Sequence, residues 1–426
     1  MTNLLLENGR VVDPANGLDG DLDVLVADGT IVEIGPDITA DGADTLDVAG
    51  CIVMPGFVDM HVHLREPGFE YKETIASGVR AAAAGGFTGV ACMPNTDPVN
   101  DHRAVTELII ERAAAAGPVH VYPIGAVSVG QRGEALAEIG ELVEAGCVAI
   151  SDDGYPVASA QLMRKALEYS QMFDIPVIDH CEEVSMTCGS VMHEGAVSAV
   201  LGLRGWPAVA EEITVSRDLI VADAVGGKLH LAHLSTAGSV QLVRDAKKHG
   251  NFATCEVMTH HFSLTDEAVR GFSTNTKMNP PLRSEQDRQA LLEAIADGTV
   301  DVIATDHAPH HADEKLLEFD NAPFGIVGLE TAIPLACTHL VHTGVIDVPR
   351  LVELMAINPS RILGVDRGGL KVGAPADITV IDLQQERQVA AGEFQSLSKN
   401  TPFDGVTLRG WPVATLVGGD IVWRRS

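Results

Sequence analysis

The stretch DMHVHLREPG, residues 59–68, places two histidines one residue apart and an arginine two residues further on. It continues the apolar residues Phe57 and Val58, and this combination predicts a short buried strand that ends in polar side chains. Side chains two residues apart on a strand point to the same face, so we expect His61 and His63 to face the same way. Two imidazoles on one face suit zinc or a similar divalent ion.

Seven further apolar runs follow this strand and alternate with longer, amphipathic segments. Segments such as KETIASGVRAAAAGG (72–86) and SEQDRQALLEAIADG (284–298) have helical periodicity and end at glycine. Eight strands alternating with helices predict an α/β fold, a (β/α)8 TIM barrel. A doubly wound sheet is disfavoured because no glycine-rich phosphate loop follows the first strand. The eight runs are 57–63, 87–93, 120–126, 147–151, 176–180, 228–233, 252–257 and 300–305.

Both chain ends consist of short predicted strands separated by tight turns. Examples are DLDVLVADGTIVEIG (21–35), with Asp28-Gly29 as a hairpin turn signal, and GVTLRGWPVATLVGGDIVWRRS (405–426). We therefore expect residues 1–54 and 366–426 to form one small, discontinuous β-sandwich domain. Residues 55–365 are then the metal-dependent barrel domain.

The charge balance excludes several classes of partner. The 426 residues include 59 acidic and 29 basic ones, a formal net charge of −30, and no Lys/Arg cluster stands out. Nucleic acid and anionic membranes are therefore not expected as partners. A signal peptide and a run of about 18 apolar residues are both absent from the sequence, so we expect a cytoplasmic protein. The seven cysteines have no Cys-x-x-Cys spacing and are expected to be reduced, buried packing residues.

The ends of the predicted strands carry the candidate functional residues, because all strand ends of a barrel meet at its catalytic mouth. Four histidines and two aspartates stand there, and packing alone does not explain them because buried unpaired carboxylates are costly. Six such ligands require two metal ions, and we expect two Zn²⁺ per subunit. The candidate ligands are His61, His63, Asp153, His180, His233 and Asp306.

These ligands divide between two ions. We assign His61, His63 and Asp306 to the first ion, and His180 and His233 to the second. An aspartate of the SDDG stretch (151–154) would lie between the ions together with a bound hydroxide.

Two choices near these ligands stay open. Asp152 competes with Asp153 for the bridging place, because the sequence alone does not fix the parity of the strand. His260 and His261 follow the seventh strand and could be ligands, but with six ligands already placed we favour a hydrogen-bonding or structural role for both.

The motifs together resemble those of a known family, the type I dihydroorotases of the amidohydrolase superfamily. The resemblance is carried by DMHVHLREPG, MPNT, SDDG, DHCEE, HLAHLSTAGS, NPPLR, ATDHAPH, EK and APFGIVGLET, and it extends over nearly the whole chain. Hydantoinases, dihydropyrimidinases and allantoinases share the barrel but bridge their metals through a carboxylated lysine after strand four. This chain has no lysine between Lys72 and Lys165, and the family pattern places Asp153 at the bridge.

The resemblance implies reversible cyclisation of N-carbamoyl-L-aspartate to L-dihydroorotate with loss of water, a step of de novo pyrimidine biosynthesis. In the hydrolytic direction, a hydroxide between the metals attacks the ring amide carbonyl. Asp306 takes the hydroxide proton and delivers it to the leaving nitrogen, as a general base and then a general acid.

The resemblance also implies where the small-molecule substrate is held. Arg65 offers a planar guanidinium to the free carboxylate of the substrate, and Asn95 and His310 complete this carboxylate clamp. Asn279 and the backbone of Phe324-Gly325 hold the amide groups of the ring. The full set of implied substrate contacts is His63, Arg65, Asn95, Asn279, His310, Phe324 and Gly325.

Two other functions compete with this interpretation. A hydantoinase-type cyclic amidase would act on substrates without the carboxylate that Arg65 binds. A non-catalytic subunit associated with aspartate transcarbamoylase is a role that dihydroorotase-like chains can take, although the six retained ligands argue against a purely structural role. Association with aspartate transcarbamoylase while active, and a homodimer, both stay open.

Overall fold

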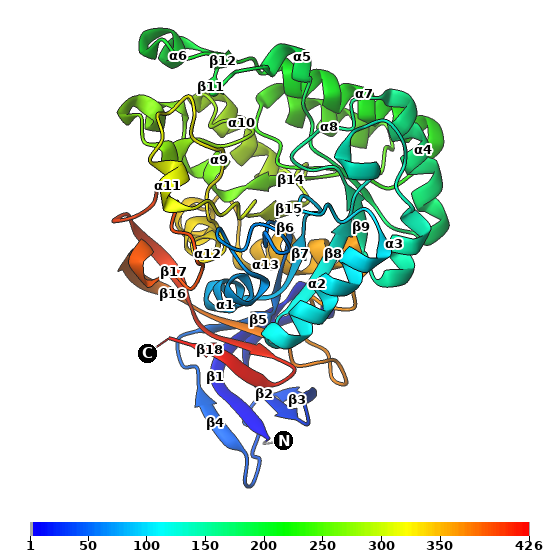
Figure 1. The fold of residues 1–426 in the computed structure, drawn as a ribbon. Coiled ribbons are helices and arrows are strands. Elements are labelled where there is room, and N and C mark those ends of the chain that lie inside the picture. Colours follow the sequence, from blue (N-terminus) through cyan, green and yellow to red (C-terminus); the bar gives the residue numbers. More distant parts are fainter. Residues whose placement is uncertain (1–2, 426) are drawn as a thin grey trace.

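Strand β6 (Phe57–Val62) is the first of eight parallel strands that form a barrel. The computed structural model describes residues 3–425, in which this barrel stands beside a separate sheet that contains both chain ends (Figure 1). Neighbouring barrel strands pair in parallel and in chain order. The predicted TIM barrel with a small β domain is therefore confirmed. The other barrel strands are β7 (Phe87–Cys92), β8 (His120–Gly125), β9 (Ala149–Ser151), β10 (Val177–Asp179), β13 (Leu229–Leu231), β14 (Thr254–Met258) and β15 (Val302–Ala304).

The barrel closes where its first and last strands meet. Val62 pairs in parallel with His307, just beyond the end of β15. The backbone N–H of His63 donates to the carbonyl oxygen of His307 at 2.9 Å. Because His63 and Asp306 are both candidate ligands, the closing contact lies within the candidate metal centre.

Each barrel strand is followed by one or more helices. Helix α1 (Ile75–Gly85) begins at a capping box between Thr74 and Ser77 and ends at Gly86, whose φ of 89° is readily adopted only by glycine. Helix α10 (Glu285–Ala296) has an equivalent capping box at Ser284. The other main helices are α2 (Arg103–Ala116), α3 (Ile139–Ala145), α4 (Ala160–Ser170), α7 (Val209–Val225), α8 (Ala237–Lys248), α12 (Ala332–Ala336), α13 (Val348–Val352) and α14 (Asn358–Leu363).

Short elements interrupt several connections at the mouth of the barrel. An excursion between β10 and α7 contains a small two-stranded sheet of its own. A short helix follows β14 and another follows β15. These elements are α5 (Val184–Thr187), β11 (Met192–His193), α6 (Ala196–Leu201), β12 (Gly205–Trp206), α9 (Thr259–Ser263) and α11 (Ala312–Lys315).

The second eight-stranded sheet joins the two ends of the chain. Strand β5 pairs with β1 on one side and with β16 on the other, so residues more than 300 positions apart become neighbours. Asp28 and Gly29 form the expected turn between β2 and β3. The domain boundaries between residues 54 and 55 and between residues 365 and 366 stay a prediction. The strands are β1 (Leu4–Asp13), β2 (Leu18–Ala27), β3 (Thr30–Gly35), β4 (Asp44–Asp47), β5 (Ile52–Pro55), β16 (Ile378–Gln388), β17 (Thr407–Val417) and β18 (Asp420–Arg424).

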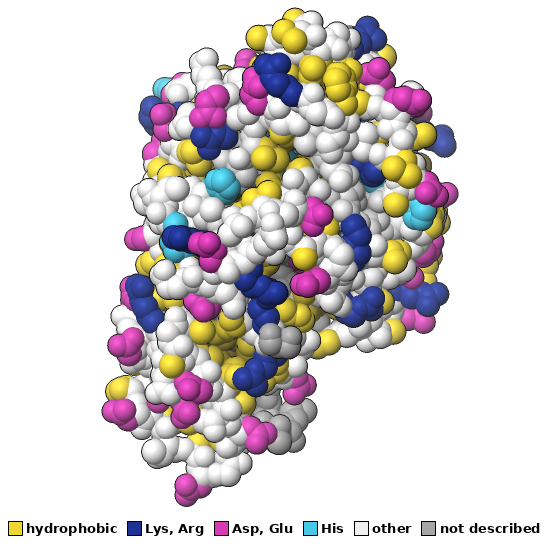
Figure 2. Space-filling view, turned by 90° about the vertical axis from the view of Figure 1, so that its left-hand side faces the viewer, with side chains coloured by type: hydrophobic (Ala, Val, Ile, Leu, Met, Phe, Trp, Pro, Cys, Tyr) yellow, Lys and Arg dark blue, Asp and Glu magenta, His cyan; other side chains and the backbone are white. Residues whose placement is uncertain are grey.

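The structure can be compared with two expectations from the sequence: the absence of a Lys/Arg cluster and the burial of the cysteines. Acidic and basic side chains are interspersed over the face shown in Figure 2. Among residues 3–425, no helix combines the length and apolar character that a membrane crossing requires. All seven cysteines are free and five are buried, but Cys51 is partly exposed and Cys188 is exposed. The expectation of burial is therefore wrong for Cys188.

Candidate metal centre

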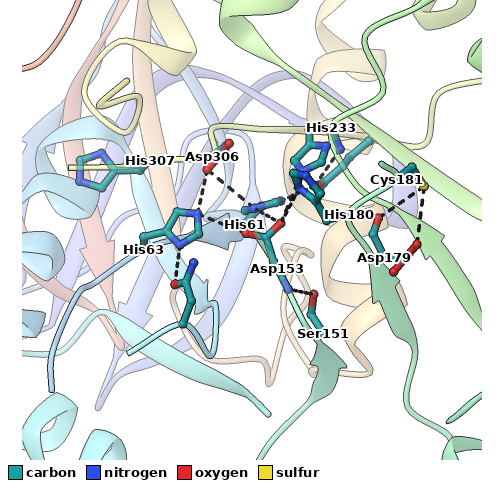
Figure 3. Close-up of polar contacts among 12 residues, drawn as sticks. His61, His63, Ser151, Asp153, Asp179, His180, Cys181, His233, Asp306 and His307 are labelled. Carbon is teal, nitrogen blue, oxygen red and sulfur yellow. Dashed lines mark hydrogen bonds and ion pairs between the residues drawn. The ribbon is translucent and has the colours of Figure 1, made fainter. Parts of the chain in front are cut away.

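The barrel brings all six candidate ligands together at one end (Figure 3). His63 Nε2 lies 2.9 Å from Asp306 Oδ1, and His61 Nε2 lies 3.7 Å from the same oxygen. On the other side, His180 Nδ1 and His233 Nε2 are 2.8 Å apart. His61 also has donor atoms close to those of Asp153 and His233, so the division of the ligands between two ions stays a prediction.

The Asp153 carboxylate lies between the two groups. Its Oδ1 is 3.4 Å from both His61 Nε2 and His233 Nε2 and 3.6 Å from His180 Nδ1, and its Oδ2 is 3.5 Å from His63 Nε2. Burial opposes ionisation of this carboxyl, but the surrounding histidines hold its pKa well below the usual value. Asp153 is thus an anion placed where it can reach both groups.

The Asp152 carboxylate, the alternative to Asp153 for the bridging position, is hydrogen-bonded to Ser128 and not to the histidines. Its Oδ1 accepts a hydrogen bond from the backbone N–H of Ser128 at 3.0 Å, and its Oδ2 accepts one from the Ser128 hydroxyl at 2.5 Å. Burial raises the pKa of Asp152 to about 6. Asp152 therefore fixes the loop after β8, and Asp153 faces the histidines.

The residues fit divalent metal ions. His61 Nε2 and Asp153 Oδ1 are buried without a hydrogen-bond partner among residues 3–425, a costly arrangement unless something binds them. Donor atoms of His61, His63 and Asp306 all lie within 4.8 Å of one another, as do donors of His61, Asp153 and His233. Nitrogen and carboxylate oxygen donors at such spacing are what zinc and related ions require.

A third cluster of possible metal donors includes the two residues that flank His180 in the sequence, but an arginine already pairs with its carboxylates. Asp179, Cys181 and Asp218 are close together, but Arg217 Nη2 is 2.7 Å from Asp218 and 3.5 Å from Asp179. The guanidinium therefore already supplies a positive charge to both carboxylates. This group supports strand β10 from outside the cavity.

Glu256 is a functional candidate that the sequence analysis missed. It lies in β14 and is completely buried, and its Oε1 is 2.6 Å from His61 Nδ1. Burial raises its pKa, but His61 and His230 outweigh that effect and bring the pKa down to about 2. A carboxylate on the second nitrogen of a ligand histidine orients the ring and increases its basicity. A charged residue in the middle of the apolar run FATCEVM was the signal for it.

Replacing Glu256 by glutamine is expected to weaken metal retention by about 10- to 100-fold, because His61 loses the charge that orients it. Titration with a chelator, followed by metal analysis of the protein, measures this directly. Glu285→Gln is a matched control, since Glu285 lies on the exposed side of α10 and pairs with Arg288. Equal chelator sensitivity of Glu256→Gln and the unaltered protein would contradict the orienting role.

Three residues that line the cavity beside the ligands have an unusual backbone. Arg65, His233 and Asp306 have φ values of 62°, 36° and 44°, in the left-handed region that residues other than glycine seldom occupy. Such strain concentrates at functional sites, where the surrounding structure enforces it. Here it turns the side chains at the ends of three segments toward the same space.

All seven predicted substrate contacts line one cavity of about 310 Å³ beside the ligands. Arg65 Nη2 lies 3.4 Å from His310 Nε2, and His63 Nδ1 lies 2.9 Å from Asn95 Oδ1. Burial lowers the pKa of Arg65 and, with the positive charge of Arg65 next to it, lowers that of His310. A neutral imidazole and a guanidinium thus share one corner of the cavity, which suits a carboxylate.

The backbone of Gly325 already has partners. Its N–H donates to the Lys277 carbonyl at 2.9 Å, and its carbonyl accepts from Lys315 Nζ at 3.1 Å. Asn279 Oδ1, in contrast, is buried without a partner among the described residues. Gly325 therefore shapes the cavity wall, and Asn279 has a free acceptor in the same lining.

The pair His260-His261 is buried and belongs to neither ligand group. Burial lowers the pKa of both imidazoles, that of His261 to about 4. His261 Nε2 donates to the carbonyl oxygen of Pro280 at 2.9 Å. His260 has no hydrogen-bond partner within residues 3–425. A hydrogen-bonding role is seen for His261 only.

Comparison with known proteins identifies the family. A family model described as Dihydro-orotase-like matches residues 50–239. A protein named Dihydroorotase from Geobacter metallireducens is 54% identical over 424 residues, 99% of this chain and 100% of that protein. Another of that name, from Geobacter sulfurreducens, is 55% identical over 425 residues, 100% of this chain and of that protein. This chain belongs to the dihydroorotase family.

The fold of this dihydroorotase-family chain is similar to solved structures of a hydantoinase and a dihydropyrimidinase. L-hydantoinase (dihydropyrimidinase) from Arthrobacter aurescens is 26% identical, with a TM-score of 0.90 over 100% of this chain and 97% of that one. Dihydropyrimidinase from Brevibacillus agri, 21% identical with a TM-score of 0.87 over 99% and 95% of the two chains, shows the same fold. The neighbours support a cyclic amide hydrolase and an amidohydrolase barrel.

Proposed function

We propose that this protein is a dihydroorotase that interconverts N-carbamoyl-L-aspartate and L-dihydroorotate in de novo pyrimidine biosynthesis. One observation carries the proposal in the structure: the guanidinium of Arg65, which is partly buried, lines the same cavity as five of the six candidate ligands. A cyclic amide would present its scissile bond to the ligands while its carboxylate meets Arg65. Hydantoin and dihydrouracil have no such carboxylate, so this corner favours dihydroorotate over the substrates of a hydantoinase.

The centre would hold two divalent ions, which we propose to be zinc. His61, His63 and Asp306 would hold one ion and His180 and His233 the other, with Asp153 reaching both. When bound, such ions lower the pKa of water to about 7 and polarise a carbonyl oxygen. In this state the two aspartates and Glu256 balance part of the positive charge, and Arg65 makes the cavity attractive to an anion.

The protein's own residues then position the substrate and move one proton. Arg65, His310 and Asn95 hold the carboxylate and so fix the ring relative to Asp306. In hydrolysis the ring C–N bond breaks and the oxygen of water bonds to the carbonyl carbon. Asp306 Oδ2 accepts the proton of the attacking water and returns it to the leaving ring nitrogen, and the reverse sequence closes the ring.

The deciding experiment is steady-state hydrolysis of L-dihydroorotate by the purified protein, with metal measured on the same sample. We expect turnover with about two metal ions per chain and little activity on hydantoin or dihydrouracil. Metal without dihydroorotate turnover would overturn the proposal. Repeating the assay with aspartate transcarbamoylase would then test a subunit role. The homodimer, that association and a cytoplasmic location stay predictions.

Replacing Arg65 by methionine is expected to raise KM for L-dihydroorotate by about 10- to 100-fold with a smaller change in kcat. Methionine preserves most of the side-chain length but removes the charged, two-pronged donor. Arg164→Met, at an exposed arginine on α4 that pairs with Glu168, is the matched control. An unchanged KM in the Arg65 variant would show that the carboxylate binds elsewhere.

A further inference from the structure

A segment from the far end of the chain reaches the candidate active site. Residues 394–401 lie between β16 and β17, outside the barrel strands. Within this segment Asn400 is buried, with 4% of its surface exposed. It contacts two loops at the mouth of the barrel: the one that follows β15 and carries His310, and the one that carries Gly325.

The Asn400 amide uses both of its donor hydrogens and its acceptor on these loops. Its Oδ1 accepts from the backbone N–H of His310 at 3.1 Å. Its Nδ2 donates to the carbonyl oxygens of Ala308 and Gly325, each at 3.0 Å. In addition, the backbone carbonyl oxygen of Asn400 accepts a hydrogen bond from the N–H of Val327 at 3.0 Å. A single side chain thus ties the two loops together.

The place where Asn400 joins these loops leaves little room. A Cβ added to Gly325 would lie 2.6 Å from both the Ala308 carbonyl oxygen and the His310 ring, so the loops are in close contact. Arg65 Nε donates to the Pro309 carbonyl at 3.2 Å, within the same short stretch. A displacement of this stretch would therefore move His310 and Arg65 together.

The 394–401 segment is itself firmly held. The N–H of Leu397 donates to the buried carboxylate of Glu73 at 3.0 Å, and the Ser396 hydroxyl also donates to it. The Ser398 hydroxyl donates to the Lys72 carbonyl at 2.7 Å. Because these anchors lie in the connection between β6 and α1, Asn400 is fixed to the same part of the barrel that carries Arg65.

We infer that Asn400 is a positioning residue for substrate binding: it fixes the His310 backbone and the Gly325 loop so that His310 and Arg65 meet the substrate carboxylate. The inference rests on the proposed function. It gives the C-terminal part of the chain a role in substrate affinity, although none of the candidate ligands or substrate contacts lies there. Asn400 touches neither Asp306 nor any other candidate ligand through a hydrogen bond in residues 3–425, so its effect should fall on binding.

The test measures KM, kcat and metal content of Asn400→Ala and Asn400→Asp with L-dihydroorotate. We expect KM to rise by about tenfold and kcat to change by less than about threefold, with metal content unchanged. The aspartate variant keeps the acceptor for His310 but turns an oxygen toward the two carbonyls, so it should show the same direction. Asn358→Ala is the control, because Asn358 is also buried and forms hydrogen bonds with Asp301 and Arg361, away from the cavity.

The outcomes separate a positioning role from a general structural one. Loss of folded protein lowers the apparent kcat but leaves KM unchanged, because KM does not depend on the fraction of active molecules. A KM within twofold of the unaltered protein in both Asn400 variants would overturn this inference alone. If Asn400→Ala is not recovered folded, the KM of Asn400→Asp decides. Absence of dihydroorotate turnover in the unaltered protein would overturn the proposed function and this inference with it.

Discussion

Asp306→Asn is expected to abolish turnover of L-dihydroorotate, with kcat falling by about 10³-fold, while the metal content stays nearly unchanged. In the unaltered protein, Asp306 Oδ1 lies 2.9 Å from His63 Nε2. The asparagine amide has the same shape as the carboxylate and keeps an oxygen at this position. It has no basic oxygen to accept a proton, so the proposed transfer from water to the leaving nitrogen is lost.

The measurement is kcat together with metal content on the same preparations. Asp313→Asn is the matched control, because Asp313 lies in α11 at the same mouth with its side chain 85% exposed. A loss of less than tenfold for Asp306→Asn would remove this residue from the proton-transfer role. A parallel loss of metal and activity would assign it a ligand role only.

Removal of metal is expected to abolish turnover completely and to lower the melting temperature. Two groups of buried histidine and aspartate donors then face one another without the ions that bind them, and ligands that bind only the folded state stabilise it. The check is activity and thermal unfolding after chelation, followed by re-addition of Zn²⁺ to the same sample. Activity above a tenth of the original in protein shown to be free of metal would contradict a metal-dependent reaction.

The eight barrel strands could be predicted because each lies in a short apolar run and these runs alternate with longer, amphipathic segments. Seven of the eight predicted runs contain the whole of the corresponding strand, from β6 within 57–63 to β15 within 300–305, and β14 extends one residue beyond the run 252–257. The convergence of the ligands followed from the fold, because strand ends of a barrel meet at one mouth. The choice between Asp152 and Asp153 did not follow, since it depends on how the chain turns after Ser151.

Glu256 and Asn400 were missed for a different reason. Their significance comes from partners that are distant in sequence: His61 is 195 positions from Glu256, and His310 is 90 positions from Asn400. Glu256 at least breaks an apolar run, but Asn400 lies in a polar stretch that reads as an ordinary loop. Contacts of this kind are set by packing, and the local sequence does not identify the distant partner.

The hydrogen bond from His63 to His307 has a consequence for how the protein folds. The two residues are 244 positions apart in the chain, so their contact has a high cost in loop entropy and is expected to form late. A partly synthesised chain that already contains His61, His63, Asp153, His180 and His233 still lacks the closing strand. The candidate metal centre is thus complete only in a finished barrel, and if the centre acts as proposed, a nascent chain has little means of catalysis before its last strand is in place.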